Sequence, residues 1–131
     1  MPTRPEPRQT GTAAVEFALV LPLVLTVALA LLQVGLLVRD RLLIEAAARA
    51  GARAAAVEAD ADAVHSAALG AAPDLDPALA TIEISRAGGQ GDPVTVSVVY
   101  DDPVRVPLIE WLFGASIRLD VEATDRQEFA S

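Results

Sequence analysis

The 131-residue chain contains no cysteine and no lysine, and it has one histidine, one tryptophan and one tyrosine. Without cysteine it can form neither a disulfide nor a thiolate metal site. Its ten basic residues are all arginine and are outnumbered by 18 acidic residues, which gives a formal net charge of −8. An acidic chain with few aromatic residues and no basic patch is a poor candidate for nucleic-acid binding, so we expect no nucleic-acid partner.

The residue patterns of common catalytic and metal sites are also missing. His65 lies in an alanine-rich segment, without the partners of a catalytic triad or a zinc site. Glu58, Asp60 and Asp62 form an acidic cluster that lacks the glycine and ligand spacing of a calcium loop. The glycines of residues 88–92 have no lysine and no following helix that would favour phosphate binding. We therefore predict no enzyme activity, no cofactor, no metal and no small-molecule substrate.

What the chain does have is one long apolar run. The residues between Glu16 and Arg39 carry no charge. As a helix they would extend for about 33 Å, enough to cross a hydrocarbon core of roughly 30 Å. The rest of the chain is too short to enclose such a helix in a protein core. We therefore predict that residues 12–38 form a transmembrane helix in contact with membrane lipid.

A cleaved secretory signal peptide is the alternative for this segment. Arg4 and Arg8 resemble its basic start, and Ala28-Leu29-Ala30 offers a cleavage site. However, the apolar run continues beyond Ala30, and a carboxylate at the head of the run is out of place in a signal peptide. A retained helix is therefore favoured over a secreted soluble domain. The charges that flank the run do not determine its orientation.

The head of the run carries a specific pattern. Residues 1–11 form a short polar leader that ends at Gly11, and Glu16 is the fifth residue after that glycine. A charge inside a membrane span costs at least a few kcal/mol, so Glu16 is a functional candidate. The pattern resembles the processing site of type IV pilin precursors, in which a prepilin peptidase cuts after a glycine. The resemblance implies that Thr12 becomes the N-terminus and that Glu16 is the carboxylate associated with pilin assembly.

The segment after the run makes this resemblance more specific. Residues 48–54, ARAGARA, resemble the run that follows the membrane helix in the TadE family of pseudopilins from tight-adherence pilus systems. The matching motif residues are Arg49, Gly51 and Arg53, while Ala50 stands where the family often has glutamate.

The resemblance to the TadE family implies a function and a location. It implies a minor pilin or pseudopilin of the cytoplasmic membrane, with a cytoplasmic N-terminus and an extracytoplasmic domain. Its partners would be a prepilin peptidase, other pilins and the pilus assembly machinery. The alternative is a single-span envelope protein whose outer domain binds a partner without entering a filament.

Outside the membrane, the sequence predicts an α+β fold. Residues 39–72 are predicted to continue the helix, since alanine has the highest helix propensity and Gly70 and Pro73 mark its end. Small residues recur every fourth position along it, either to permit close packing or simply because alanine is abundant. The members of this stripe are Ala47, Gly51, Ala55, Ala59, Ala63 and Ala67.

Residues 73–131 are predicted to form a small antiparallel three-stranded sheet, with residues 88–92 as a hairpin turn. Apolar residues alternate with polar ones in three segments, and the long helix is expected to cover their apolar face. The alternating residues are Ile82 and Ile84, then Val94, Val96 and Val98, then Ile117, Leu119 and Val121. Residues 107–113 are predicted to be a short helical or irregular crossover whose Trp111 packs against the sheet, a partner-facing patch being the alternative.

Overall fold

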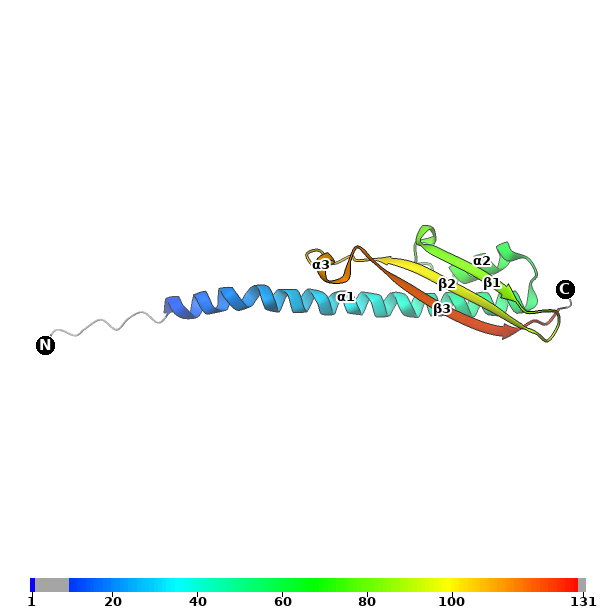
Figure 1. Ribbon diagram of the computed structural model, residues 1–131, viewed down its shortest axis with the longest axis horizontal. Helices are drawn as coiled ribbons and strands as arrows, with labels where there is room; N and C mark the ends of the chain where they lie inside the picture. Colours follow the sequence, from blue (N-terminus) through cyan, green and yellow to red (C-terminus); the bar gives the residue numbers. More distant parts are fainter. Residues whose placement is uncertain (2–9, 130–131) are drawn as a thin grey trace.

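A computed structural model describes Met1 and residues 10–129. The dominant element is helix α1 (Thr10–Val57), 48 residues long, which confirms the predicted long N-terminal helix. The other elements gather around its C-terminal part, so its N-terminal part projects alone (Figure 1). Pro22 lies within α1 without ending it, and the Pro22 carbonyl oxygen accepts a 2.8 Å hydrogen bond from the Thr26 hydroxyl. Most of the predicted leader, residues 2–9, lies outside the described residues.

The sheet has the predicted antiparallel arrangement. Strands β1 (Ala80–Arg86), β2 (Pro93–Pro103) and β3 (Ser116–Arg126) pair in the order β1-β2-β3. More and less exposed residues alternate along all three strands, as expected for a sheet with one covered face. The predicted turn joins β1 to β2, and Gly91 adopts a positive φ of 89° there, which glycine tolerates best. The α+β fold with a long helix on a three-stranded sheet is therefore confirmed.

The prediction of a single helix from residue 39 to residue 72 is wrong. Helix α1 ends at Val57, and a second helix, α2 (Ala61–Gly70), packs against it. Asp60 is the N-cap of α2, because its side chain accepts a 3.1 Å hydrogen bond from the Asp62 N–H. Arg86 donates hydrogen bonds to the carbonyl oxygens of Ala55 and Glu58 at the end of α1. These contacts end one helix and start the next despite the high helix propensity of alanine.

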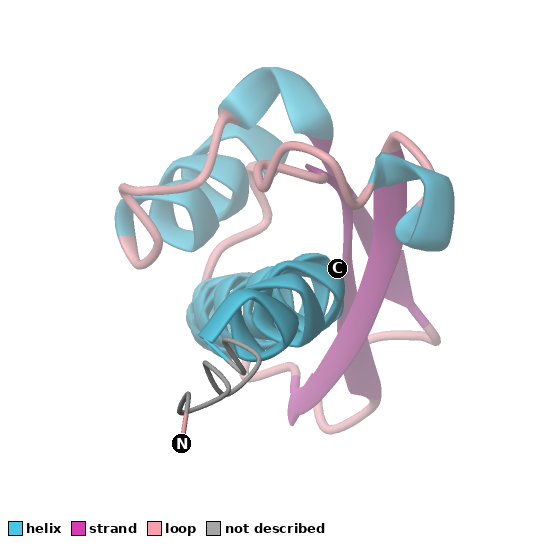
Figure 2. Cartoon of the chain, turned by 90° about the vertical axis from the view of Figure 1, so that its left-hand side faces the viewer, coloured by secondary structure: helices cyan, strands magenta, loops and turns pink. Residues whose placement is uncertain are grey.

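The core lies where α1 meets the sheet and α2. Viewed along its axis, α1 has the sheet on one side and α2 on another (Figure 2). The residues of α1 that are buried near the sheet are small, and β2 contributes valines from its covered face. The fully or nearly buried core residues include Ile44, Ala47, Ala48, Ala52, Ala55, Val64, Ala68, Val94, Val96, Val98 and Tyr100. The stripe of small residues is thus used for close packing along α1, whereas Ala59 lies in the break between the helices and is exposed.

The crossover between β2 and β3 contains the predicted short helix, α3 (Glu110–Phe113). The prediction that Trp111 packs against the sheet is wrong, because its side chain is 76% exposed. The crossover turns along α1 toward the N-terminal part of the helix instead (Figure 1). Val104, Val106 and Ile109 form a second small core there, and Leu29 and Leu36 of α1 pack against it. Residues on the other side of α3, including Trp111, are left uncovered.

Candidate functional site

The N-terminal part of α1 is a bare apolar helix. All residues from Gly11 to Leu25 are exposed, and the most apolar stretch of the helix has no protein cover. By length and composition, α1 is the one helix among the described residues that could cross a membrane. A long, uncovered apolar helix of this kind indicates a single-pass membrane protein.

The predicted processing residues lie at the start of this helix. Gly11 and Thr12 belong to its first turn, and nothing lies within 4 Å of the position that a Cβ atom on Gly11 would occupy. Glu16 lies four residues after Thr12, on the same helix face and about 6 Å along the axis. Among the described residues, no cation forms an ion pair with Glu16. Its carboxylate is therefore accessible to a group on another molecule.

The predicted motif residues Arg49, Gly51 and Arg53 lie about 50 Å further along α1, so the structure does not bring them near Glu16. Gly51 is buried where α1 meets both the sheet and α2. A Cβ atom there would lie 3.0 Å from Val96 Cγ1 and 3.3 Å from Ala68 Cβ, so glycine permits the close approach. Arg53 is exposed.

Arg49 belongs to a charged face of α1. Its guanidinium lies 2.9 Å from Glu45, which also lies 3.5 Å from Arg41. These residues line a polar groove of about 560 Å³ together with Asp120 and Glu122 of β3. Exposed helix pairs of this kind contribute only about 0.3–0.5 kcal/mol each, so they add little to stability.

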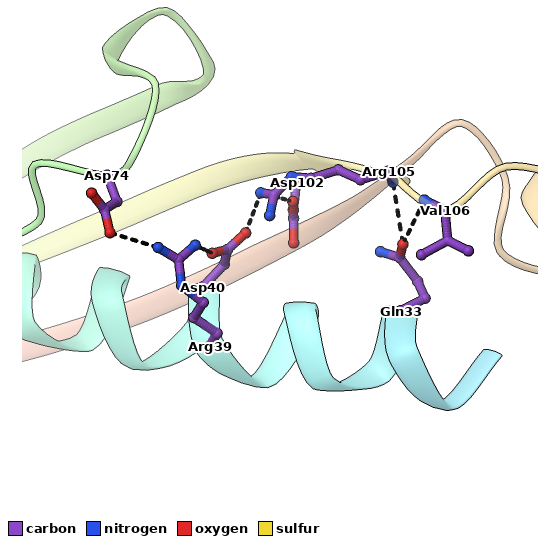
Figure 3. A network of polar contacts seen from close by, with 7 residues as sticks. All are labelled: Gln33, Arg39, Asp40, Asp74, Asp102, Arg105 and Val106. Carbon is purple, nitrogen blue, oxygen red and sulfur yellow. Dashed lines mark hydrogen bonds and ion pairs between the residues drawn. The ribbon is translucent and has the colours of Figure 1, made fainter. Parts of the chain in front are cut away.

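A buried polar network joins α1 to the crossover (Figure 3). We call Gln33, Asp40, Asp102 and Arg105 the junction cluster. The Arg105 guanidinium contacts both carboxylates, Asp102 at 2.8 Å and Asp40 at still shorter range. Both carboxylate side chains are 1% exposed, whereas that of Arg105 is 35% exposed. Arg105 therefore compensates two buried negative charges from one partly open position.

Arg39 extends this network to the loop after α2. Its guanidinium lies 3.2 Å from Asp40 and 2.5 Å from Asp74 (Figure 3). The two arginines and three carboxylates thus link α1, the end of β2 and the loop that precedes β1. Burial, followed by the nearby Asp40 charge, raises the pKa of Asp102 from its usual 3.8 to about 6, although Arg105 acts in the opposite direction.

Gln33 is the buried polar residue of the apolar run. Its side-chain carbonyl oxygen accepts hydrogen bonds from the backbone N–H groups of Arg105 and Val106, each at 3.2 Å. These N–H groups belong to the irregular backbone after β2, where no strand partner is available. Gln33 therefore fixes the point at which the crossover docks on the helix.

Sequence reasoning missed the junction cluster. The charges that flank the apolar run were considered only for its orientation, and no pattern singled out Asp102 or Arg105. The one local signal was the spacing of Asp102 and Arg105, three residues apart. Among the described residues, no group of three or more histidine, aspartate or glutamate side chains is placed to hold a metal ion.

Comparison with known proteins gives a match for most of helix α1. The model of the family described as "TadE-like protein" matches residues 11–53. Residues 11–53 are thus similar to the TadE-like family, and we call them the TadE-like segment. This confirms the resemblance over the part of the chain that contains Gly11, Thr12, Glu16 and the three motif residues. Comparisons with curated proteins and with solved structures gave no match.

The TadE-like segment covers nearly all of α1 and ends just after the close contact at Gly51. The TadE-like family is a family of pilus components and not a family of enzymes. The junction cluster combines Gln33 and Asp40 from inside the segment with Asp102 and Arg105 from outside it.

Proposed function

We propose that this protein is a minor pilin or pseudopilin that acts in the assembly of a tight-adherence pilus. A prepilin peptidase removes residues 1–11, and the mature chain begins at Thr12. The N-terminus faces the cytoplasm before processing, and the domain lies outside the cytoplasmic membrane. The observation that carries the proposal is the position of Glu16, exposed near the free end of a bare apolar helix whose other end holds the domain.

The physical basis of assembly is the compensation of charge between subunits. Cleavage after Gly11 creates an α-amino cation at the end of a helix that would pack among other apolar helices. A buried charge without a partner is strongly unfavourable. Because Glu16 has no ion-pair partner among the described residues, it can receive the amine of a neighbouring subunit, so neither charge is buried alone.

The rest of the structure suits a subunit that moves from membrane to filament without refolding. The domain core lies on residues 44–56 of α1, well away from the bare segment, so the apolar helix can exchange lipid for neighbouring helices while the core stays intact. Gly51 and the surrounding alanines hold the sheet and α2 close to α1. In this account the motif residue Gly51 supports the fold of the subunit, whereas Gly11, Thr12 and Glu16 serve processing and assembly.

The test of processing is a substitution at Gly11. Gly11→Val should leave the full-length precursor, because the peptidase pocket would have to accept a branched side chain. Gly35→Val is the matched control, since it adds the same atoms to α1 at a position where a Cβ also meets nothing within 4 Å. Mass spectrometry of the N-terminus should give Thr12 for the wild type and for the control, and Met1 for Gly11→Val. A mature Gly11→Val chain that begins at Thr12 would defeat the assignment.

A further inference from the structure

The tip of the crossover, residues 106–113, presents apolar side chains to its surroundings. Leu108 is 81% exposed, Trp111 is 76% exposed and Leu112 is 51% exposed. Single exposed apolar residues are ordinary on protein surfaces. These three, however, belong to residues 106–117, VPLIEWLFGASI, in which Glu110 is the one charged residue. The exposed tip is therefore an apolar surface rather than a scattered set of side chains.

The backbone at the tip is strained. Leu108 has a φ of 70°, in the left-handed region that a leucine rarely adopts. A strained residue persists where its surroundings favour the conformation, and such residues cluster at functional positions. The Leu108 side chain is 81% exposed. Burial of this side chain within the domain therefore does not maintain its strained backbone conformation.

The other side of the tip lies against the bare helix. Leu108 and Ile109 line an apolar groove of about 380 Å³ whose further walls are α1 residues between Ala18 and Leu29. Ile109 belongs to the small core against which Leu29 and Phe113 pack. The tip therefore reaches the level of Leu29, about 15 Å along the helix axis from Arg39, the first charge beyond the apolar run.

This position leaves a bare helix at the lower limit of what crosses a membrane. Residues 12–28, which precede Leu29 in α1 and in part line the groove beside the tip, are about 25 Å long. The hydrocarbon core is roughly 30 Å thick, and 17 residues are the lower limit of what a spanning helix needs. If Thr12 lies at one surface of the hydrocarbon core, the opposite surface of that core lies roughly 5 Å past the level of Leu29, toward the domain. The tip must then enter the bilayer beside the helix.

The crossover is equipped for that environment. Backbone polar groups at membrane depth must be hydrogen-bonded within the protein. Where the crossover meets the apolar helix, the Gln33 side-chain oxygen accepts hydrogen bonds from the N–H groups of Arg105 and Val106 (Figure 3). Farther along the tip, the N–H groups of Leu112, Phe113 and Gly114 donate to the carbonyl oxygens of Ile109 and Glu110.

We propose that residues 106–113 insert into the interfacial region of the bilayer, on the side that carries the domain, and that Leu108, Trp111 and Leu112 contact lipid acyl chains. Tryptophan is the side chain most typical of this region. The exposed carboxylate of Glu110 limits the depth, since it must remain among the headgroups. The membrane anchor then consists of a helix and a loop. This inference rests on a membrane-spanning α1 and is independent of any role in a pilus.

Trp111 allows a direct test because it is the single tryptophan of the chain. The full chain is reconstituted into vesicles of phosphatidylcholine and phosphatidylglycerol that carry bromine either near the headgroup or near the end of the acyl chain. Trp111 fluorescence should be quenched by both lipids and more strongly by the shallow bromines. Fluorescence that neither lipid quenches would overturn the proposal. An emission spectrum that shifts with the protein-to-lipid ratio, without quenching, would show that a second copy covers the tip, and would overturn it as well.

A pair of variants tests whether the tip itself makes the contact. Leu108→Ser should remove most of the quenching by the shallow bromines, because it replaces the most exposed apolar side chain of the tip. Leu42→Ser is the control, since Leu42 is also exposed, at 61%, but lies on α1 beside the domain core. Equal loss of quenching in both variants, or no loss in Leu108→Ser, would contradict a contact made through the tip.

Discussion

Gln33 and Val106 are 73 positions apart in the chain, and the Gln33 side-chain oxygen accepts a 3.2 Å hydrogen bond from the Val106 N–H. The same oxygen accepts from the Arg105 N–H. A polar side chain in the middle of an apolar run thus holds the backbone of a distant loop. This contact explains why the run contains a glutamine that is 0% exposed.

The first prediction concerns this contact. Gln33→Leu keeps the approximate size of the side chain and leaves the buried Val106 N–H and the part-buried Arg105 N–H without an acceptor. The cost is about 1–3 kcal/mol for the buried group and less for the other. Hydrogen exchange of the Arg105 and Val106 amides should become faster, while exchange in the β2–β3 pairing stays unchanged. Thr26→Val is the control, because the Thr26 hydroxyl bonds only to its own helix. Unchanged exchange at both amides would show that Gln33 does not hold the crossover.

The second prediction concerns Arg105. Arg105→Met keeps much of the aliphatic stem but leaves Asp40 and Asp102 facing each other without the cation between them. Removing one partner from a buried charge pair typically lowers the free energy of unfolding by about 3–5 kcal/mol. We expect a loss at the lower end of this range, because the Arg105 side chain is 35% exposed and Arg39 still lies 3.2 Å from Asp40. Chemical unfolding of the full chain in detergent, followed by circular dichroism, measures this loss. Arg118→Met is the control on the exposed side of β3 and should change stability by less than about 0.5 kcal/mol.

The third prediction is a pH dependence that arises from Asp102. Its pKa in the folded protein is about 6, above the ordinary 3.8, so the folded state binds more protons than the unfolded state between these values. The contribution of Asp102 to the free energy of unfolding therefore rises as the pH falls, by about 1 kcal/mol from pH 7 to pH 5.

Asp102→Asn should remove this dependence, because an amide stays neutral while its oxygen can still accept from Arg105. It should also be more stable than the wild type at pH 7. Asp101→Asn, at the exposed neighbouring position of β2, is the control and should keep the pH dependence. A wild-type protein whose stability falls between pH 7 and pH 5, with Asp102→Asn behaving identically, would contradict the raised pKa.

Much of the fold could be predicted from local patterns. Apolar residues at every second position located all three strands, because one face of the sheet packs on the core, with α1 against β2 and β3. The charge-free run located the exposed part of α1, and the glycines of residues 88–92 located the turn. The fifth-residue glutamate and the ARAGARA segment led to the TadE family, and the match over residues 11–53 confirmed that resemblance.

What could not be predicted depends on contacts between distant residues. The break after Val57 is fixed in part by Arg86 at the end of β1, which donates to the carbonyl oxygens of Ala55 and Glu58. Alanine propensity alone predicts an unbroken helix there. The junction cluster joins Gln33 and Asp40 of α1 to Arg105, which lies 72 and 65 positions away. The local spacing of Asp102 and Arg105 does not indicate these partners on α1. Trp111 was expected on the sheet because large aromatic residues are usually covered, but the crossover follows α1 instead.

The most direct test of the account is the behaviour of Glu16→Gln in cells that assemble the pilus. The amide keeps the shape of the side chain and removes the charge, so the helix should insert at least as well, and cleavage after Gly11 should proceed. The α-amino group of a neighbour would lose its buried partner, a loss of about 3–5 kcal/mol. We predict processed protein that begins at Thr12, remains in the membrane fraction and does not co-fractionate with pilus components. Normal co-fractionation of the processed Glu16→Gln protein would contradict the assembly role of Glu16 and remove the main physical support for a pilin.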